Sequence, residues 1–531
     1  MFRISAFLLL LSFSAVILPQ APLPTADTTL FAGSGKCIAC HISNKAGVLM
    51  TYGESLTPTN HWKSSMMANA SKDPFWRAVV SEETKKFPEL AKMIETTCTR
   101  CHSPMGNAQS KYEGKEHFSL AEVKENSLWN DGVSCTLCHQ IQPANMGQQS
   151  SYSGGFEIKP GRVIFGPYPN PLQGPMRNTI RFEAEYSPHM SNAEICATCH
   201  TLFTPYLDDD KKIAGIFAEQ TPYIEWKNSS YPAAGTPCQS CHMPPTTDSI
   251  DISTTPPPHK VKHSPFWRHT FVGPNVWIGK ILRDNIQQLK ATSSAELFDS
   301  TINRANLLLT EKSINLEIFP EKKGDIITTK VKIENLAGHK IPTGIPYRRM
   351  WIHYTVKDAN GNIVFESGGW DDAGKIKDTK EIYQDHYDLI TEPSQVQVYE
   401  GIFQDVNRKQ TYTLLRAASY IKDNRIPPAG FKSNHVSYDT VKIVGAAVND
   451  PDFNKGKNGE GTGSDFVTYK TRVNATGEYT VSAEVLYQSA TPELVEYVYK
   501  SDTEEINEFY EMYKRSPNTP VIMKAAIAKV Q

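Results

Sequence analysis

Five copies of the motif Cys-x-x-Cys-His lie between residues 37 and 242, and they contain all ten cysteines of the 531-residue chain. The cysteines are Cys37, Cys40, Cys98, Cys101, Cys135, Cys138, Cys196, Cys199, Cys238 and Cys241, and the histidines are His41, His102, His139, His200 and His242. One short turn places both sulfurs at one edge of a porphyrin and turns the imidazole toward the iron. This motif attaches haem c. The sequence therefore predicts five covalently bound haem c groups, each with a motif histidine as its first axial ligand.

Two other uses of cysteine fit this pattern less well. A disulfide framework would not place a histidine after every second cysteine. Structural zinc sites use paired Cys-x-x-Cys units, and five units cannot all be paired. Haem attachment is therefore the favoured interpretation of all five motifs.

The length and charge of the chain exclude several classes of protein. A chain of 531 residues is too long for a single hydrophobic core, so two or more domains are expected. The formal net charge is only -2, with both signs interspersed along the sequence. There is no basic footprint for nucleic acid and no polybasic patch for a membrane surface. The expected partners are redox proteins that serve as electron donor and acceptor.

The first 26 residues are typical of a secretory signal peptide. Arg3 precedes an apolar run over residues 4–18, and Ala21 and Ala26 are candidate cleavage positions. An uncleaved anchor is the alternative, but the run is short of the ~20 residues that span a bilayer. We expect an exported bacterial protein, periplasmic or extracellular, with no membrane span after cleavage. Attachment of haem c outside the cytoplasm agrees with this expectation.

The pattern of apolar and polar residues changes near residue 312. Residues 27–311 are expected to form the haem domain. Apolar periodicity is weak between residues 37 and 242, where short helices and loops are expected to wrap the haems, and residues 276–289 and 295–309 show helical spacing. Residues 312–490 contain alternating strand patterns, with a hairpin turn signal at residues 359–362. Residues 491–531 show helical spacing and are expected to form a helical tail. The predicted fold is multidomain α+β: a haem-packed, mainly helical and loop domain, then an antiparallel, immunoglobulin-like β-sandwich.

A second axial ligand is needed if each haem is to be a six-coordinate electron carrier. The candidate histidines outside the motifs are, in order of preference, His61, His269, His189, His339, His117 and His263. His353, His386 and His435 are expected to be structural or surface residues. A haem that lacks a partner histidine would instead offer an open position to a substrate.

The polar, glycine-rich stretch over residues 449–465 raises the question of a calcium site. Asp450, Asp452 and Asp465 could supply carboxylate ligands. The spacing of an EF-hand loop is absent, however. A solvated loop is therefore the favoured interpretation, with calcium as a weaker alternative.

Several strings resemble the cytochrome c-552/4 group of multihaem cytochromes, relatives of the tetrahaem carrier that accepts electrons from hydroxylamine oxidation. They are HWKSSMMANASKDPFW, DGVSCTLCH, AEICATCH, PYIEWKNSSY with CQSCHMP, RHTFVGPN and AGHKIPTGIPYRRMW, and they span most of residues 37–352. The later strands resemble the C-terminal region of uncharacterised secreted members. The resemblance implies that the histidines of the HW and GH strings, His61 and His339, are distal haem ligands.

The leading hypothesis for function is an electron carrier without catalytic residues. The main alternative is a reductase or oxidase of a small nitrogen or sulfur oxyanion at a five-coordinate haem, with Arg348 and Arg349 as a candidate electropositive patch. The pentahaem nitrite reductases resemble this chain in haem number, but they have a lysine in place of one motif histidine. No Cys-x-x-Cys-Lys is present here. A third alternative is a subunit of an extracellular cytochrome filament.

Overall fold

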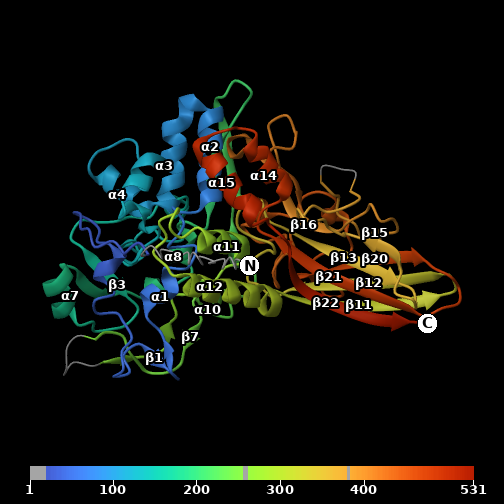
Figure 1. Ribbon diagram of the computed structural model, residues 1–531, viewed down its shortest axis with the longest axis horizontal. Helices are drawn as coiled ribbons and strands as arrows, with labels where there is room; N and C mark the ends of the chain where they lie inside the picture. Colours follow the sequence, from blue (N-terminus) through green and yellow to red (C-terminus); the bar gives the residue numbers. More distant parts are fainter. Residues whose placement is uncertain (1–19, 255–260, 380–382) are drawn as a thin grey trace, which may run out of the picture.

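The computed structural model describes residues 20–254, 261–379 and 383–531. Helices and short strands form one half of the molecule, and two larger sheets form the other (Figure 1). The mixture of helices and sheets agrees with the predicted α+β class. Most of the expected signal peptide, residues 1–26, lies outside the described residues.

The first half consists of short helices and five two-stranded sheets. The helices are α1 Pro58–Trp62, α2 Pro74–Lys86, α3 Ala91–His102, α4 Pro104–Tyr112, α5 Leu120–Glu125, α6 Cys135–Cys138, α7 Gln173–Ile180, α8 Glu194–Ala197, α9 Pro222–Lys227, α10 Cys238–His242, α11 Val276–Asp284 and α12 Ala295–Leu307. The paired strands are β1 Met50–Thr51 with β2 Glu54–Ser55, β3 Val163–Gly166 with β4 Glu183–Tyr186, β5 Leu202–Leu207 with β6 Ile213–Gln220, β7 Pro245–Thr246 with β10 Phe266–Trp267, and β8 Ile250–Asp251 with β9 Lys262–His263. The β5–β6 hairpin is an addition to the helices and loops that the sequence predicts.

Helix α2 shows how local sequence signals position the first half. The side chain of Asp73 accepts hydrogen bonds from the backbone of Phe75 and Trp76, and Pro74 occupies the first helical position. Both features favour a helix start at this point. The helix then presents Trp76, Val80 and other residues of one face to the interior of the first half.

The second half contains two sheets that share one hydrophobic core. The four-stranded sheet has the order β11 Ile314–Lys323, β12 Ile326–Asn335, β20 Ser464–Arg472 and β15 Leu389–Ile390. The six-stranded sheet has the order β17 Ser419–Asp423, β16 Val398–Gln404, β13 Arg349–Lys357, β21 Tyr479–Gln488 and β22 Val521–Val530, with β14 Ile363–Ser367 on β13. The remaining elements are α13 Tyr438–Val441, the hairpin β18 Lys455–Gly456 with β19 Gly459–Glu460, α14 Pro492–Tyr499 and α15 Glu504–Arg515. Alternate residues of both sheets, such as Val331 and Val481, are fully buried between them.

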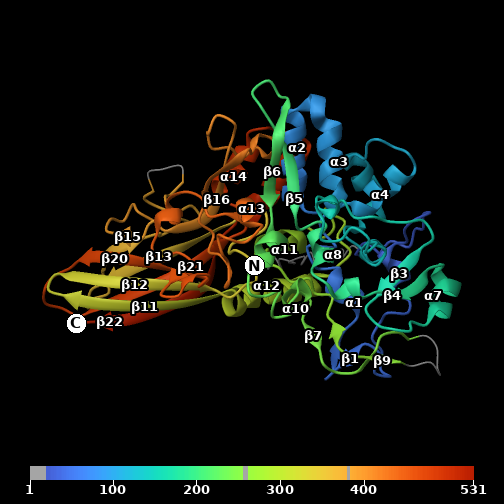
Figure 2. The same ribbon diagram turned by 180° about the vertical axis from the view of Figure 1, so that it is seen from behind.

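The last forty residues differ from the helical tail that the sequence predicts. Helices α14 and α15 are present, but Val521–Val530 forms β22, which pairs antiparallel with β21 inside the six-stranded sheet. The two helices also return to the first half, where Val495 and Phe509 share a core with Val79 of α2. Figure 1 shows α15 beside α2, and Figure 2 shows the same molecule from behind. The end of the chain therefore ties the two halves together.

One property of the helices bears on the membrane question. Among the described residues, no helix is long and apolar enough to cross a bilayer.

Candidate functional site

The five motifs fold into helical turns, as their chemistry requires. Motifs two to five involve α3, α6, α8 and α10, and the first follows the 3-10 turn Ser34–Lys36. The backbone N–H of His41 donates to the carbonyl of Cys37 at 3.0 Å, and that of His200 donates to Cys196 at 2.9 Å. Such a turn brings residues three and four apart to one face. Each motif therefore presents its two sulfurs and its imidazole on the same side.

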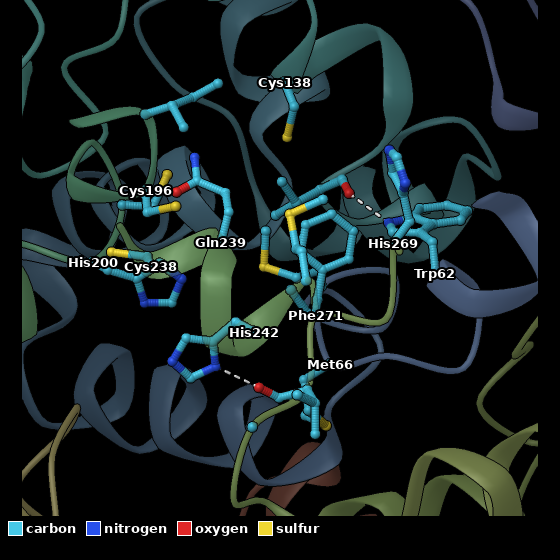
Figure 3. Close-up of a pocket in the computed structure, with 18 of the residues that line it drawn as sticks. Trp62, Met66, Cys138, Cys196, His200, Cys238, Gln239, His242, His269 and Phe271 are labelled. Atoms are coloured by element: carbon cyan, nitrogen blue, oxygen red, sulfur yellow. Dashed lines mark hydrogen bonds between the residues drawn. The ribbon is translucent and has the colours of Figure 1, made fainter. Parts of the chain in front are cut away.

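All five motifs open onto one continuous cavity of about 1640 Å³ in the first half of the molecule. Every motif cysteine and every motif histidine lines it, together with apolar side chains such as Trp62, Met66 and Phe271 (Figure 3). Ordinary ligand pockets measure roughly 300–1,000 Å³. Protein interiors are otherwise close-packed, so an apolar space of this size suits several large flat groups. The sulfur, imidazole and apolar lining fit covalently attached haem.

Four of the five motif histidines are held by the same kind of hydrogen bond. The Nδ1 atoms donate to backbone carbonyls: His41 to Ile252 at 2.8 Å, His102 to Ala70 at 3.0 Å, His139 to Phe165 at 2.7 Å, and His242 to Val272 at 2.6 Å. A bond at Nδ1 fixes the ring and leaves the lone pair on Nε2. Burial lowers the pKa of His102 to about 4, so its ring stays neutral, as a metal ligand must be.

Two further histidines face motif histidines at a distance that a shared metal would set. The ring centroids of His139 and His269 are 6.4 Å apart with 15° between planes, and those of His242 and His339 are 6.3 Å apart with 19° between planes. An imidazole nitrogen lies about 1.1 Å from the ring centroid and a metal–nitrogen bond is about 2.0 Å, which gives about 6.2 Å for two rings on one metal. Direct stacking is closer, as in the 4.4 Å between Trp76 and His102.

The two partner histidines also carry the hydrogen bond seen on the motif rings. Nδ1 of His269 donates to the carbonyl of Trp267 at 3.0 Å, and Nδ1 of His339 donates to the carbonyl of Lys340 at 2.9 Å. Both rings therefore keep Nε2 free. Burial, followed by the nearby His139, lowers the pKa of His269 to about 3, which also keeps this ring neutral.

The remaining candidate ligands do not all reach the cavity. His263 lines it, but its ring stacks on Tyr168 at 4.1 Å. His61 is buried in α1, and burial, with Arg304 as the next contribution, lowers its pKa to about 4. His61 lies outside the cavity lining, although the adjacent Trp62 is part of it. The structure therefore leaves His61 close to the haem region without placing it opposite a motif histidine.

The rings of His189 and His117 are bonded to protein groups in the structure. Nδ1 of His189 is bonded to the Ser187 hydroxyl at 2.6 Å, and Nε2 is bonded to the carbonyl of Ile141 at 3.0 Å. Both nitrogens are therefore used. Nε2 of His117 pairs with Glu95 at 2.7 Å, and the ring does not line the cavity. In the structure, both nitrogens of His189 and Nε2 of His117 have protein partners, and the ligand role expected of these two residues stays a prediction.

The three histidines expected to be structural or at the surface all lie in the second half. His353 bridges Glu366 and Glu484, at 2.8 and 3.1 Å. His386 is buried against Asp450, and His435 bonds the hydroxyl of Ser437. None of the three is part of the cavity lining.

The motifs lie close enough for their thiols to influence one another. The neighbouring Cys37 raises the pKa of the Cys135 thiol, Cys199 raises that of Cys101, and Cys238 raises that of Cys196. Burial, with Cys199 as the next contribution, raises the pKa of Cys138 to about 12. Motif one is therefore beside motif three, and motif four is near motifs two, three and five. Figure 3 shows Cys196 and Cys238 side by side.

The two arginines singled out in the sequence have different positions. Arg348 lines the cavity; its Nη1 donates to the carbonyl of Thr343 at 2.7 Å, and its buried Nε has no partner among the described residues. Burial is the main reason that the pKa of His200 falls to about 4, and His242 and Arg348 lower it further. Arg349 instead points away and binds Gln488 and the carbonyl of Gly374. Of these two arginines, only Arg348 lines the cavity.

Glu83 and Glu219 are two of the buried carboxyl groups that line the cavity. Burial, with Glu82 as the next contribution, raises the pKa of Glu83 to about 8, and burial raises that of Glu219 to about 7. Both lie near the second motif, because both contribute to raising the pKa of the Cys98 thiol after burial. Burial therefore favours the protonated form of both carboxyl groups.

A buried ion-pair network connects the halves next to His339. Glu225 of α9 accepts from Arg425 Nη1 at 3.0 Å, from the backbone N–H of Lys340 at 3.1 Å and from the Thr343 hydroxyl at 2.6 Å. Asp423 in turn binds Lys340 Nζ at 2.7 Å and Arg425 at 2.8 Å. The sequence does not predict this network, because its charged residues lie in separate segments: Glu225 in α9, Asp423 in β17, and Lys340 and Arg425 in loops. The network holds the backbone that directly follows His339.

Comparisons with known proteins support the fold. No family model matches the sequence, and no curated protein does. The structure is similar to the crystal structure of a penta-heme cytochrome c552 from Thermochromatium tepidum, with a TM-score of 0.52 and 15% identity, covering 94% of this chain and 98% of that chain. At this identity, the similarity shows a shared fold over nearly the whole chain.

Proposed function

We propose that this protein is an exported pentahaem c-type cytochrome that carries electrons between redox partners. The observation that carries the proposal is the single cavity lined by all five Cys-x-x-Cys-His motifs. The similar fold of a penta-heme cytochrome supports it. When bound, the haems supply the redox centres, and this chain's residues fix their positions and axial ligands.

The ligand arrangement is part of the proposal. The ring pairs His139–His269 and His242–His339 are the axial ligands of the third and fifth haems, since their spacing and free Nε2 atoms suit one metal each. His61 and His263 are the nearest candidates for a further haem. Two imidazole ligands give a six-coordinate haem, which suits electron transfer. Because the fourth motif is near three others, electrons that reach any motif have neighbouring motifs to move to.

The number of haems follows directly from the motifs. The purified mature protein is expected to carry five covalent haems, because each motif keeps both cysteines and its histidine on one face of a turn. Intact mass spectrometry of the denatured holoprotein checks this. A fully matured sample with four haems or fewer would contradict the prediction.

One observation favours a reductase as the second candidate. Within the described ranges, no second imidazole faces His41, His102 or His200 at the spacing of the two ring pairs, and of these three His200 has Arg348 nearby. An open metal position beside a guanidinium could hold a small oxyanion. Arg348 could equally bind a haem propionate. The motif histidines are all present, which favours the carrier.

Reoxidation kinetics separate the two functions. Protein reduced with dithionite is expected to reoxidise slowly with nitrite or hydroxylamine and fast with a ferric soluble cytochrome or chelated iron. A carrier needs only exposed, closely spaced redox centres, whereas a reductase needs an open site with proton donors. Stopped-flow absorbance measures both rates on the same preparation.

The Arg348→Gln variant provides the control for this experiment. If the carrier proposal holds, the variant leaves the rates with both nitrogen compounds slow. Rapid, saturable reoxidation by nitrite or hydroxylamine, with ammonium as product and loss of rate in Arg348→Gln, would replace the carrier with the reductase.

A further inference from the structure

Two loops of the second half and the start of β20 bring four aspartates together at one end of the four-stranded sheet. Asp388 directly precedes β15, Asp450 and Asp452 follow the 3-10 turn Ala446–Asn449, and Asp465 lies near the start of β20. Figure 1 shows β15 and β20 close to each other. Ligand atoms of Asp388, Asp450 and Asp452 all lie within 4.8 Å of one another, as do those of His386, Asp450 and Asp465. Within residues 449–465, Asp450 and Asp465 are therefore folded inward, whereas residues 456–460 are exposed, as expected of a solvated loop.

Two carboxylate oxygens in this cluster are buried and lack a donor. Asp465 is fully buried; its Oδ2 accepts from the Tyr399 hydroxyl at 2.6 Å, but its Oδ1 has no hydrogen-bond partner in the described part of the chain. Oδ1 of Asp452 is likewise buried and unpaired. A buried, unsatisfied carboxylate oxygen is costly. Both oxygens thus need a positive partner that the protein does not supply.

The surrounding basic groups do not neutralise the cluster. Nζ of Lys455 binds the backbone carbonyls of Val448 and Asp450, at 3.2 and 2.9 Å. Lys330 provides a positive charge near the exposed Asp388. The negative charge is therefore in excess at this point of the fold.

His386 orients the cluster and is not free to bind a metal. Its Nδ1 accepts from the amide of Gln397 at 2.8 Å and from that of Asn424 at 3.0 Å. The proton is then on Nε2, which donates to Oδ2 of Asp450 at 2.8 Å. Oδ1 of Asp450 accepts from the backbone of Asp452 and Phe453. The ligands that remain are all oxygens, which suits a hard cation and disfavours zinc.

We propose that Asp388, Asp450, Asp452 and Asp465, two groups of close ligand atoms that share Asp450, form a Ca²⁺ site that ties two loops to the start of β20. Ca²⁺ accepts six to eight oxygens in flexible geometry, so backbone carbonyls and water complete the set. Phe453, beside Asp452, packs into the core between the sheets and against His386 at 5.0 Å. The bound ion therefore stabilises the folded second half by mass action.

The test uses the full-length holoprotein after removal of divalent ions with a chelator. Equilibrium dialysis against ⁴⁵Ca²⁺ measures binding, and far-UV circular dichroism measures the unfolding temperature with and without Ca²⁺. The expected result is one saturable Ca²⁺ per chain that is lost in Asp465→Asn, and a higher unfolding temperature of the wild type in Ca²⁺. Asp388→Asn is expected to weaken binding about tenfold or more, since affinity follows the number of charged ligands.

Matched controls separate this site from other carboxylates, including haem propionates. Asp372→Asn removes an exposed aspartate outside the cluster and is expected to bind Ca²⁺ like the wild type. Asp388 is exposed, so Asp388→Asn tests the site even if Asp465→Asn does not fold. Unchanged binding in Asp388→Asn would overturn the proposal. So would an unfolding temperature that does not respond to ~10 mM Ca²⁺, which exceeds the roughly 10⁻⁴–10⁻³ M dissociation constants of extracellular sites; the carboxylates would then share protons. Tighter binding of Zn²⁺ than of Ca²⁺ would overturn the choice of ion.

Discussion

Replacing His339 with alanine is expected to convert one of the five proposed haems from low spin to high spin. The ring of His339 lies opposite His242 at 6.3 Å and has its Nε2 free, so its removal leaves that haem with one imidazole. Optical spectra and quantitative EPR of the ferric protein measure the change. The new high-spin signal should correspond to one iron per chain.

Two further variants make this result specific. His269→Ala is expected to produce the same change at the third motif, and the double variant to produce twice the signal, because the two ring pairs are separate. His435→Ala removes a histidine that bonds Ser437 outside the cavity and should leave the spectrum unchanged. A wild-type spectrum in His339→Ala would refute the ligand assignment and would make the 6.3 Å spacing a coincidence of packing.

The sequence predicts well those features that depend only on residues close together in the chain. The haem motifs need only one turn of chain, so their spacing alone identifies them. The hairpin at residues 359–362 is confirmed, since β13 and β14 flank Gly361 with a φ of 85°. Helical spacing likewise predicts α11 and α12 at nearly their observed positions.

The pairing of histidines depends on folding over long distances and is not visible in the sequence. His269 lies opposite His139 and His339 opposite His242, in each case across about a hundred residues or more of chain. The strings around His61 resemble those of known relatives, yet the structure does not place its ring against a motif histidine. The hydrogen bonds that occupy His189 come from Ser187 and from distant Ile141, and only the first is local.

The domain boundaries are harder still, because the halves share cores. The sequence separates residues 27–311 from the strands, yet α14 and α15 pack against α2 and α11. A fragment ending near residue 310 would therefore expose apolar side chains of α2, such as Val79, besides losing His339. Point variants of the full chain are the better test of the link between the halves.

Replacing Glu225 with alanine is expected to destabilise the protein by about 3–5 kcal/mol, the usual cost of removing one partner of a buried ion pair. Glu225 is fully buried, and its loss leaves Nη1 of Arg425, the backbone N–H of Lys340 and the Thr343 hydroxyl without their acceptor. Denaturant unfolding followed by far-UV circular dichroism measures the change. Because these groups hold the backbone beside His339, the variant should also show a partly high-spin haem under native conditions.

A surface pair provides the matched control for this experiment. Glu496→Ala removes the partner of Lys375, a pair at 2.7 Å whose side chains are 37% and 55% exposed, and it should change stability little. Added salt should likewise leave the effect of Glu225→Ala unchanged, since buried pairs are weakly screened. A double-mutant cycle with Arg425→Ala then isolates the pair itself. If Glu225→Ala unfolds like the wild type and keeps its spectrum, packing of the apolar cores holds the halves together and positions His339, and the ion pairs contribute little.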